Sequence, residues 1–191
     1  MDYLYKRHPK GTYEYADYKK KVDIAVMLFL FALALGLYII GRVATGSNRN
    51  ILTIVAVLGL LPACKMVVDV IMCFRVKSCE QELKSRIDAS VGKLYGMYNM
   101  YFTSYNKNYL IAHLVLSGNS VIGLCTDKGF DEKSFKEHLS ELLIKEGIKD
   151  VMIKVFTDDK RYITRLTELN EAEGAAGHNI SLETLIRNVT L

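Results

Sequence analysis

Four aspartates close to two predicted strand ends are the strongest candidates for chemistry in this chain. Asp127 and Asp131 follow one apolar run, and Asp158 and Asp159 follow another. In α/β proteins, ligands bind at the carboxyl ends of the strands. Carboxylates gathered at that edge would suit Mg²⁺ and a phosphate group. An aspartate at a strand-to-helix junction is also a common helix N-cap, and this second interpretation needs no metal.

A second group of ionisable residues lies in the two most apolar stretches. Asp23 is close to the start of the first stretch, while Lys65 and Asp69 stand four residues apart in the second. Charged side chains in hydrocarbon are costly and often functional, which would fit an ion or proton relay. Alternatively, Lys65 extends its charged end to the membrane surface and pairs locally with Asp69. We favour this alternative, because two spans offer little room for a transport path unless the protein oligomerises.

Motifs for nucleotide binding, nucleophilic catalysis or metal binding are absent from the sequence. We find no Gly-x-Gly-x-x-Gly, Walker A, Gly-x-Ser-x-Gly or His-Glu-x-x-His pattern. The four cysteines form no Cys-x-x-Cys pair, so neither zinc nor a disulfide framework is indicated. We therefore predict no cofactor, no catalytic residue and no metal site beyond the aspartate candidates.

The elements that must position these residues begin with two apolar segments. Residues 22–41 and 51–74 are each long enough, at about 1.5 Å per residue, to cross a hydrocarbon core of about 30 Å. The polar residues 42–50 contain a Gly-Ser-Asn turn, which predicts a transmembrane hairpin with a short outer loop. A cleaved signal peptide is the rival interpretation, but the acidic residues of the leader and the long apolar run disfavour it.

The distribution of lysine and arginine predicts the orientation of the hairpin. Six basic residues lie in the Tyr-rich leader 1–21 and four closely follow the second span, whereas the loop has two. Because basic residues favour the cytoplasmic side, we expect an integral membrane protein with both termini in the cytoplasm.

The remaining residues predict a small α/β domain. Apolar side chains spaced three and four apart predict an amphipathic juxtamembrane helix over 75–105. The rest of the domain, 106–191, begins with two apolar runs, 109–116 and 120–126, which are joined by a Ser-Gly-Asn turn and read as a β-hairpin.

Alternating helix and strand signals complete the domain. The next segments predict a helix over 131–146, a strand over 150–157, a helix over 158–170, a linker over 174–177 and a last helix capped by Ser181. The unit 120–157 should be a parallel strand-helix-strand crossover. The predicted fold is thus a two-helix transmembrane hairpin followed by a domain of order αββαβαα, with a mixed sheet and one parallel crossover.

Charge and motif content together favour a binding protein. The net charge of +4 arises from the amino end, while residues 75–191 are balanced, so we expect no nucleic-acid partner. We predict a membrane-anchored cytoplasmic domain that acts as a non-enzymatic binding or scaffold module, with the lipid bilayer and either a protein or a second copy as partners. The alternatives are a metal-dependent phosphoester hydrolase using Asp127 and Asp158, and an accessory subunit of a channel or transporter.

Overall fold

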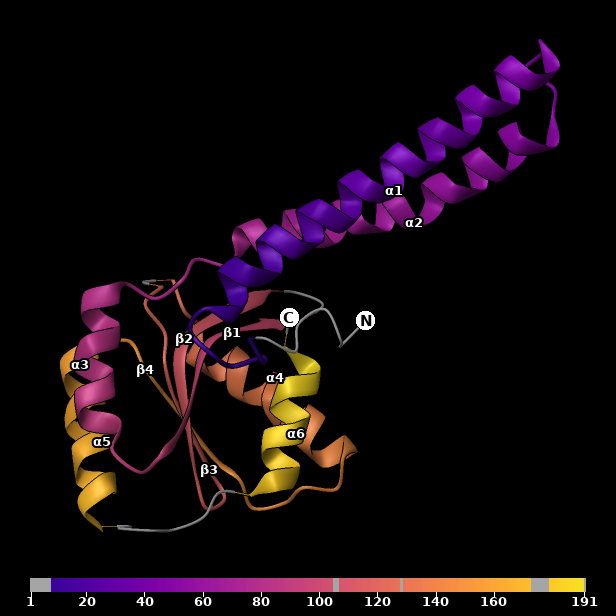
Figure 1. Cartoon of the computed structure of the whole chain (residues 1–191). Coiled ribbons are helices and arrows are strands. Elements are labelled where there is room, and N and C mark those ends of the chain that lie inside the picture. The colour runs from indigo at the N-terminus through magenta and orange to yellow at the C-terminus, as the bar shows by residue number, and fades with distance from the viewer. Residues whose placement is uncertain (1–7, 105–106, 128, 173–178, 191) are drawn as a thin grey trace. The chain divides into compact units, whose positions relative to one another are not determined.

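The computed structural model describes residues 8–104, 107–127, 129–172 and 179–190 (Figure 1). The chain divides into two units. Within the described residues, 16–75 form a helical hairpin, and 8–15 join 76–190 in an α/β domain. The predicted linker at 174–177 lies outside the described residues.

The hairpin consists of α1 (Tyr15–Thr45) and α2 (Ile51–Arg75). Both helices are long and apolar enough to cross a membrane. They pack closely where small residues meet: Ala34 and Ala63 are buried, and a Cβ added to Gly59 would lie 4.0 Å from the Cβ of Ala34. Close backbone approach through small residues is typical of helices packed in membranes.

α1 begins seven residues before the predicted start of the apolar span at residue 22. Two ion pairs support the added polar turns: Lys20 pairs with Asp17, and Lys19 pairs with Asp23. Oppositely charged side chains three or four residues apart stabilise a helix. Part of the predicted leader is therefore helical.

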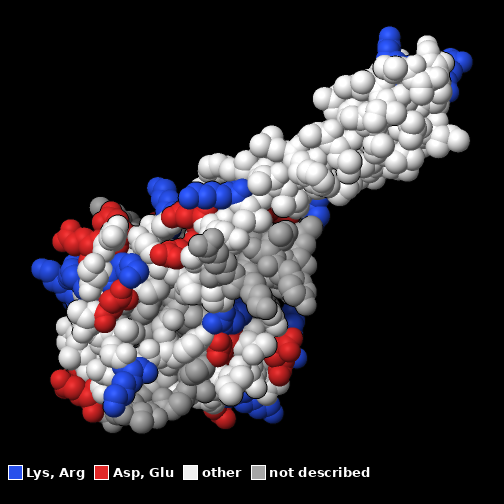
Figure 2. All heavy atoms as spheres, in the orientation of Figure 1, with Lys and Arg blue, Asp and Glu red and all other residues white. Residues whose placement is uncertain are grey.

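The outer surface of the hairpin is strongly apolar. Large side chains such as Phe29 and Leu61 are 66% and 67% exposed. Figure 2 shows long stretches of the hairpin without charged atoms, whereas both signs of charge are interspersed over the α/β domain. A continuous apolar surface of this kind is typical of helices that face lipid.

The domain is built on a four-stranded mixed sheet of order β1-β2-β3-β4. The strands are β1 (Tyr95–Thr103), β2 (Asn108–Ser117), β3 (Ser120–Leu124) and β4 (Met152–Phe156). β1 and β3 pair antiparallel with β2, and β4 pairs parallel with β3. The predicted β-hairpin and parallel crossover are therefore confirmed.

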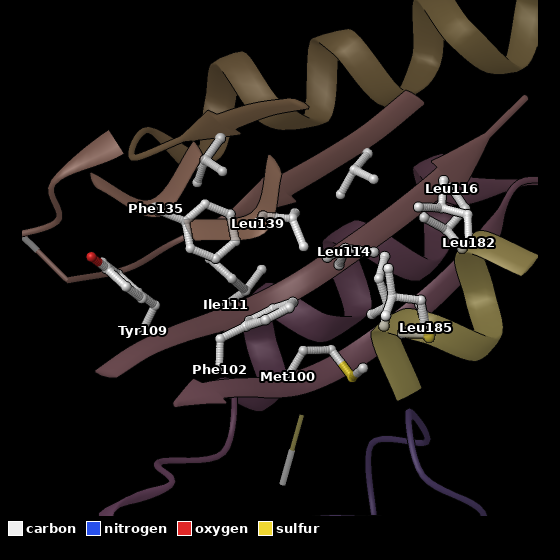
Figure 3. Close-up of a cluster of buried hydrophobic side chains, with 14 of the residues drawn as sticks. Met100, Phe102, Tyr109, Ile111, Leu114, Leu116, Phe135, Leu139, Leu182 and Leu185 are labelled. Atoms are coloured by element: carbon white, nitrogen blue, oxygen red, sulfur yellow. The ribbon is translucent and has the colours of Figure 1, made fainter. Parts of the chain in front are cut away.

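Helices cover both faces of the sheet (Figure 1). They are α3 (Gln81–Val91), α4 (Glu132–Lys145), α5 (Asp159–Ala172) and α6 (Ile180–Val189). On one face, Ile87 of α3 and Tyr162 of α5 pack on Val115 and Leu124. On the other face, α4 and α6 pack on the larger core, where Phe135 lies among side chains of β1 and β2 (Figure 3). The sheet thus has a separate apolar core on each side.

The helix predicted over 75–105 is wrong beyond Val91. Gly92 ends α3 with a φ of +53°, and residues 95–103 form β1. Asn170 approaches Gly92 so closely that a Cβ there would lie 2.3 Å from its Nδ2, which leaves room only for glycine. The tyrosines of this segment therefore belong to a strand and cannot form the face of a helix.

The last helix also begins differently from the prediction. Asn179 caps α6, and its side-chain oxygen accepts hydrogen bonds from the N–H groups of Ser181 and Leu182. Ser181 is the second residue of the helix, so its predicted capping role is wrong. Asparagine is as effective an N-cap as serine, and its position two residues earlier lengthens the helix by two residues at its start.

Candidate functional site

All four candidate aspartates accept hydrogen bonds from nearby backbone N–H groups. Asp131 caps α4 by accepting from Ser134 N at 3.1 Å. Asp127 accepts from Gly129 N, and both Asp158 and Asp159 accept from Lys160 N, each at 2.9 Å. Among the described residues, no group of three or more His, Cys, Asp or Glu side chains is placed to hold a metal ion. The geometry matches helix capping and tight turns.

A pocket of about 520 Å³ opens at the carboxyl ends of β3 and β4. Its size falls in the range of pockets that hold small molecules. The α2–α3 linker, the first turns of α3 and the residues just beyond the two strands line it. The lining residues are Lys77, Ser78, Cys79, Glu80, Glu82, Leu83, Arg86, Ala112, Leu124, Thr126, Thr157 and Asp159. Of the four aspartates, Asp159 contributes to this pocket.

The pocket is lined by apolar, charged and hydroxyl side chains. Arg86 of α3 and Asp159 of α5, which both line it, form an ion pair at 2.6 Å. The hydrogen bond from Arg86 holds the pKa of the Asp159 carboxyl below its usual value. Thr126 and Thr157 add hydroxyl groups at equivalent strand ends. These groups can donate and accept hydrogen bonds, so the pocket suits a small polar ligand.

The linker that lines the pocket is fixed by Asn99 of β1. The N–H of Cys79 donates to Asn99 Oδ1 at 2.8 Å, and Asn99 Nδ2 donates to the Tyr13 carbonyl at 3.1 Å. The Tyr13 hydroxyl closes the arrangement by donating to the Cys79 carbonyl at 2.7 Å. Asn99 is 6% exposed and has a φ of +55°. One asparagine therefore joins the segment before α1 to the segment after α2.

Cys79 is the thiol at this pocket, and its surroundings make it a poor nucleophile. Burial raises the pKa of Cys79 to about 11, with a smaller contribution from Glu80. Since the thiolate is the reactive form, a thiol with such a pKa stays protonated at neutral pH.

His113 of β2 is buried on the sheet face that α3 and α5 cover. Its side chain is 1% exposed, and its Nδ1 lies 2.7 Å from the Tyr162 hydroxyl. Gly96 on β1 leaves room for the ring, because a Cβ there would lie 2.6 Å from His113 Nε2. Burial lowers the pKa of His113 to about 3. The histidine is a neutral core residue.

The three candidate ionisable residues of the hairpin, Asp23, Lys65 and Asp69, fall into two local groups. Asp23 is 1% exposed, accepts from Lys19 Nζ at 2.7 Å, and accepts from the Cys73 thiol at 3.3 Å. Lys65 and Asp69 form an ion pair with an N–O distance of 3.9 Å. The structure thus places Asp23 beside Lys19 and Cys73, and Lys65 beside Asp69.

Comparison of the chain with known protein families, with curated proteins and with solved structures gives no match. The site also contains Arg86, Thr126 and Thr157, and Asn99 holds its linker, none of which the sequence indicated as site residues. A threonine directly before each strand-end aspartate was the available signal for two of them.

Proposed function

We propose that this chain is an integral membrane protein in which α1 and α2 anchor a cytoplasmic α/β domain, and that the domain binds a small polar ligand. The ligand occupies the pocket at the carboxyl ends of β3 and β4. The domain acts as a binding module without catalysing a reaction.

The pocket is the observation that carries this proposal. It lies at the edge of the sheet where α/β proteins bind ligands, and it is lined by the ion pair of Arg86 and Asp159. The aspartates that a hydrolase would need for metal binding are engaged with backbone N–H groups. This arrangement favours binding over metal-dependent hydrolysis.

The position of the pocket along the chain supports a role at the membrane. Lys77 lines the pocket and follows Arg75, the last residue of α2, by two positions. A ligand in contact with Lys77 is therefore one residue along the chain, Val76, from a helix that we place in the membrane. Anchoring and binding would share one short segment of the chain.

A pocket-blocking variant tests the proposal. Thr157 is exposed just beyond β4, so Thr157→Trp should fill the pocket without disturbing a core. Thr167→Trp places the same side chain on the exposed face of α5 and serves as the matched control. The full chain is purified in detergent, incubated with a deproteinised small-molecule extract of the expression host, and examined by native mass spectrometry.

We expect the unmodified chain and Thr167→Trp to retain a bound small molecule that Thr157→Trp loses. Equal thermal stability of the two variants would show that the loss is local. Retention by Thr157→Trp, or the absence of any bound small molecule on the unmodified chain, would contradict the proposal.

A further inference from the structure

α2 carries two stripes of side chains on opposite faces. The buried stripe faces α1 and consists of Ala56, Ala63, Met66, Val70 and Cys73. The outer stripe is exposed, with alternating spacings of four and three residues, and consists of Ile54, Leu58, Leu61, Lys65 and Val68. Two residues advance about 200° around an α-helix, so Leu61 and Lys65 both point away from the side of Ala63.

The outer stripe leaves a charged group uncovered in an apolar surface. The Lys65 side chain is 75% exposed, between Leu61 at 67% and Val68 at 58%. Its contact with Asp69 is long, at 3.9 Å, and uses at most one of the three donors of the ammonium group. In hydrocarbon such a pair is costly, and polar side chains of membrane helices usually face a protein partner.

The spacing of the outer stripe is that of a coiled-coil seam. Alternating steps of four and three residues place Leu58 and Lys65 at the a positions, and Leu61 and Val68 at the d positions. Asp69 then occupies the neighbouring e position, from which side chains form ion pairs between helices. A single lysine at an a position is known to fix register and oligomeric state.

We propose that two copies of this chain associate in parallel through the outer stripe of α2, with Lys65 of each copy paired with Asp69 of the other. The inference rests on the proposed membrane insertion, which gives both copies the same orientation. A two-fold axis brings the same surface of each copy together, so the surface must complement itself. Lys65 and Asp69 meet this requirement, because they carry opposite charges one helical turn apart. Association of the two copies also covers Leu61 and Val68.

Cysteine cross-linking in membranes tests this interface. The full chain carries Cys64→Ser, which removes the exposed native thiol and leaves the three buried ones. Leu61→Cys places a thiol on the outer stripe. Leu33→Cys is the matched control, because Leu33 is 51% exposed on α1 and adjoins Ala34, which lies beside Gly59 at a similar depth. We expect oxidation to cross-link Leu61→Cys several-fold more than Leu33→Cys.

Charge variants test the exchanged ion pairs. In the Leu61→Cys background, a copy with Lys65→Asp has an aspartate at both position 65 and position 69. A copy with Asp69→Lys has a lysine at both of these positions. Co-expressed with different tags, these two copies should cross-link to each other several-fold more than either cross-links to itself. Where a doubled charge blocks insertion, Asp69→Asn in both copies should lower the cross-linking of Leu61→Cys several-fold.

Extraction with alkaline carbonate separates this inference from the proposed function. The dimer would be overturned if the protein stays in the membrane but cross-links equally at Leu61→Cys and Leu33→Cys, or if the charge variants do not change the cross-linking. Either result would support a Lys65 that extends to the membrane surface or binds another protein. Protein released by carbonate would overturn the membrane insertion itself.

Discussion

His113 shows how strongly the sheet controls the protonation of a single residue. The imidazole is enclosed between Tyr98, whose ring centroid is 4.3 Å away, and Tyr162, which shares a hydrogen bond with it. Next to it, the Tyr98 hydroxyl donates to Asp88 at 2.5 Å. Burial raises the pKa of the Tyr98 hydroxyl, and Asp88 adds to this effect. A proton on His113 would leave an uncompensated charge in the core.

This arrangement predicts an acid-dependent loss of stability. The pKa of His113 falls from 6.5 to about 3 on folding, so the unfolded chain takes up a proton that the folded chain does not. The free energy of unfolding should therefore decrease as the pH falls from about 6.5 towards 3, by up to about 1.4 kcal/mol per pH unit from this residue. Above about pH 6.5, His113 should contribute no pH dependence.

Denaturant unfolding of the full chain in detergent, followed at several pH values, measures this slope. His113→Phe keeps a ring in the core but removes the titrating group. We expect it to be less stable at neutral pH and to show a shallower slope below about pH 6.5. Equal slopes for His113→Phe and the unmodified chain would show that His113 is not the source.

Among the elements, the α2–α3 linker depends most on one side chain. Asn99 binds the backbone of both Cys79 and Tyr13, and it does so from a left-handed conformation that asparagine tolerates better than most residues. The linker contributes four consecutive residues, 77–80, to the pocket wall. Its order should therefore determine whether the pocket exists.

Two substitutions of Asn99 separate hydrogen bonding from backbone strain. Asn99→Gly removes both side-chain hydrogen bonds but suits the positive φ, whereas Asn99→Ala removes them and adds strain. We expect the amide of Cys79 to exchange with solvent much faster in both variants, and Asn99→Ala to be the less stable by about 1 kcal/mol. Unchanged exchange at residues 77–80 would contradict the role of Asn99. Hydrogen-deuterium exchange with mass spectrometry gives this measurement.

Elements defined by local signals were predictable, and those defined by distant contacts were not. The β2–β3 hairpin, α4 and β4 have clear turns and caps, such as Asp131 at the start of α4. β1 was missed because its aromatic side chains, covered on both faces, also fit a helical spacing. Gly92 could have marked the end of α3, but its need for glycine comes from Asn170 on α5.

The candidate site was predictable in position but not in composition. Strand order alone placed it at the carboxyl ends of β3 and β4. The participation of Arg86 depends on how α3 packs beside α5, and that of Cys79 depends on Asn99, both of which are tertiary contacts without a sequence motif.

At the scale of the whole molecule, the two units present different surfaces to their surroundings. The hairpin exposes large apolar side chains along both helices, whereas the domain surface carries charges of both signs (Figure 2). Basic residues lie at the predicted cytoplasmic ends of the helices, and the loop holds Arg42 and Arg49. In the topology that we propose, the loop and the domain lie on opposite sides of a membrane.

Labelling of two introduced cysteines tests this topology most directly. In the Cys64→Ser background, Ser47→Cys places a thiol in the exposed loop and Ser85→Cys places one on the exposed face of α3. Intact cells are treated with a membrane-impermeant maleimide. We expect Ser47→Cys to be labelled in intact cells and Ser85→Cys to be labelled only after permeabilisation. Labelling of Ser85→Cys in intact cells, with Ser47→Cys protected, would contradict this topology.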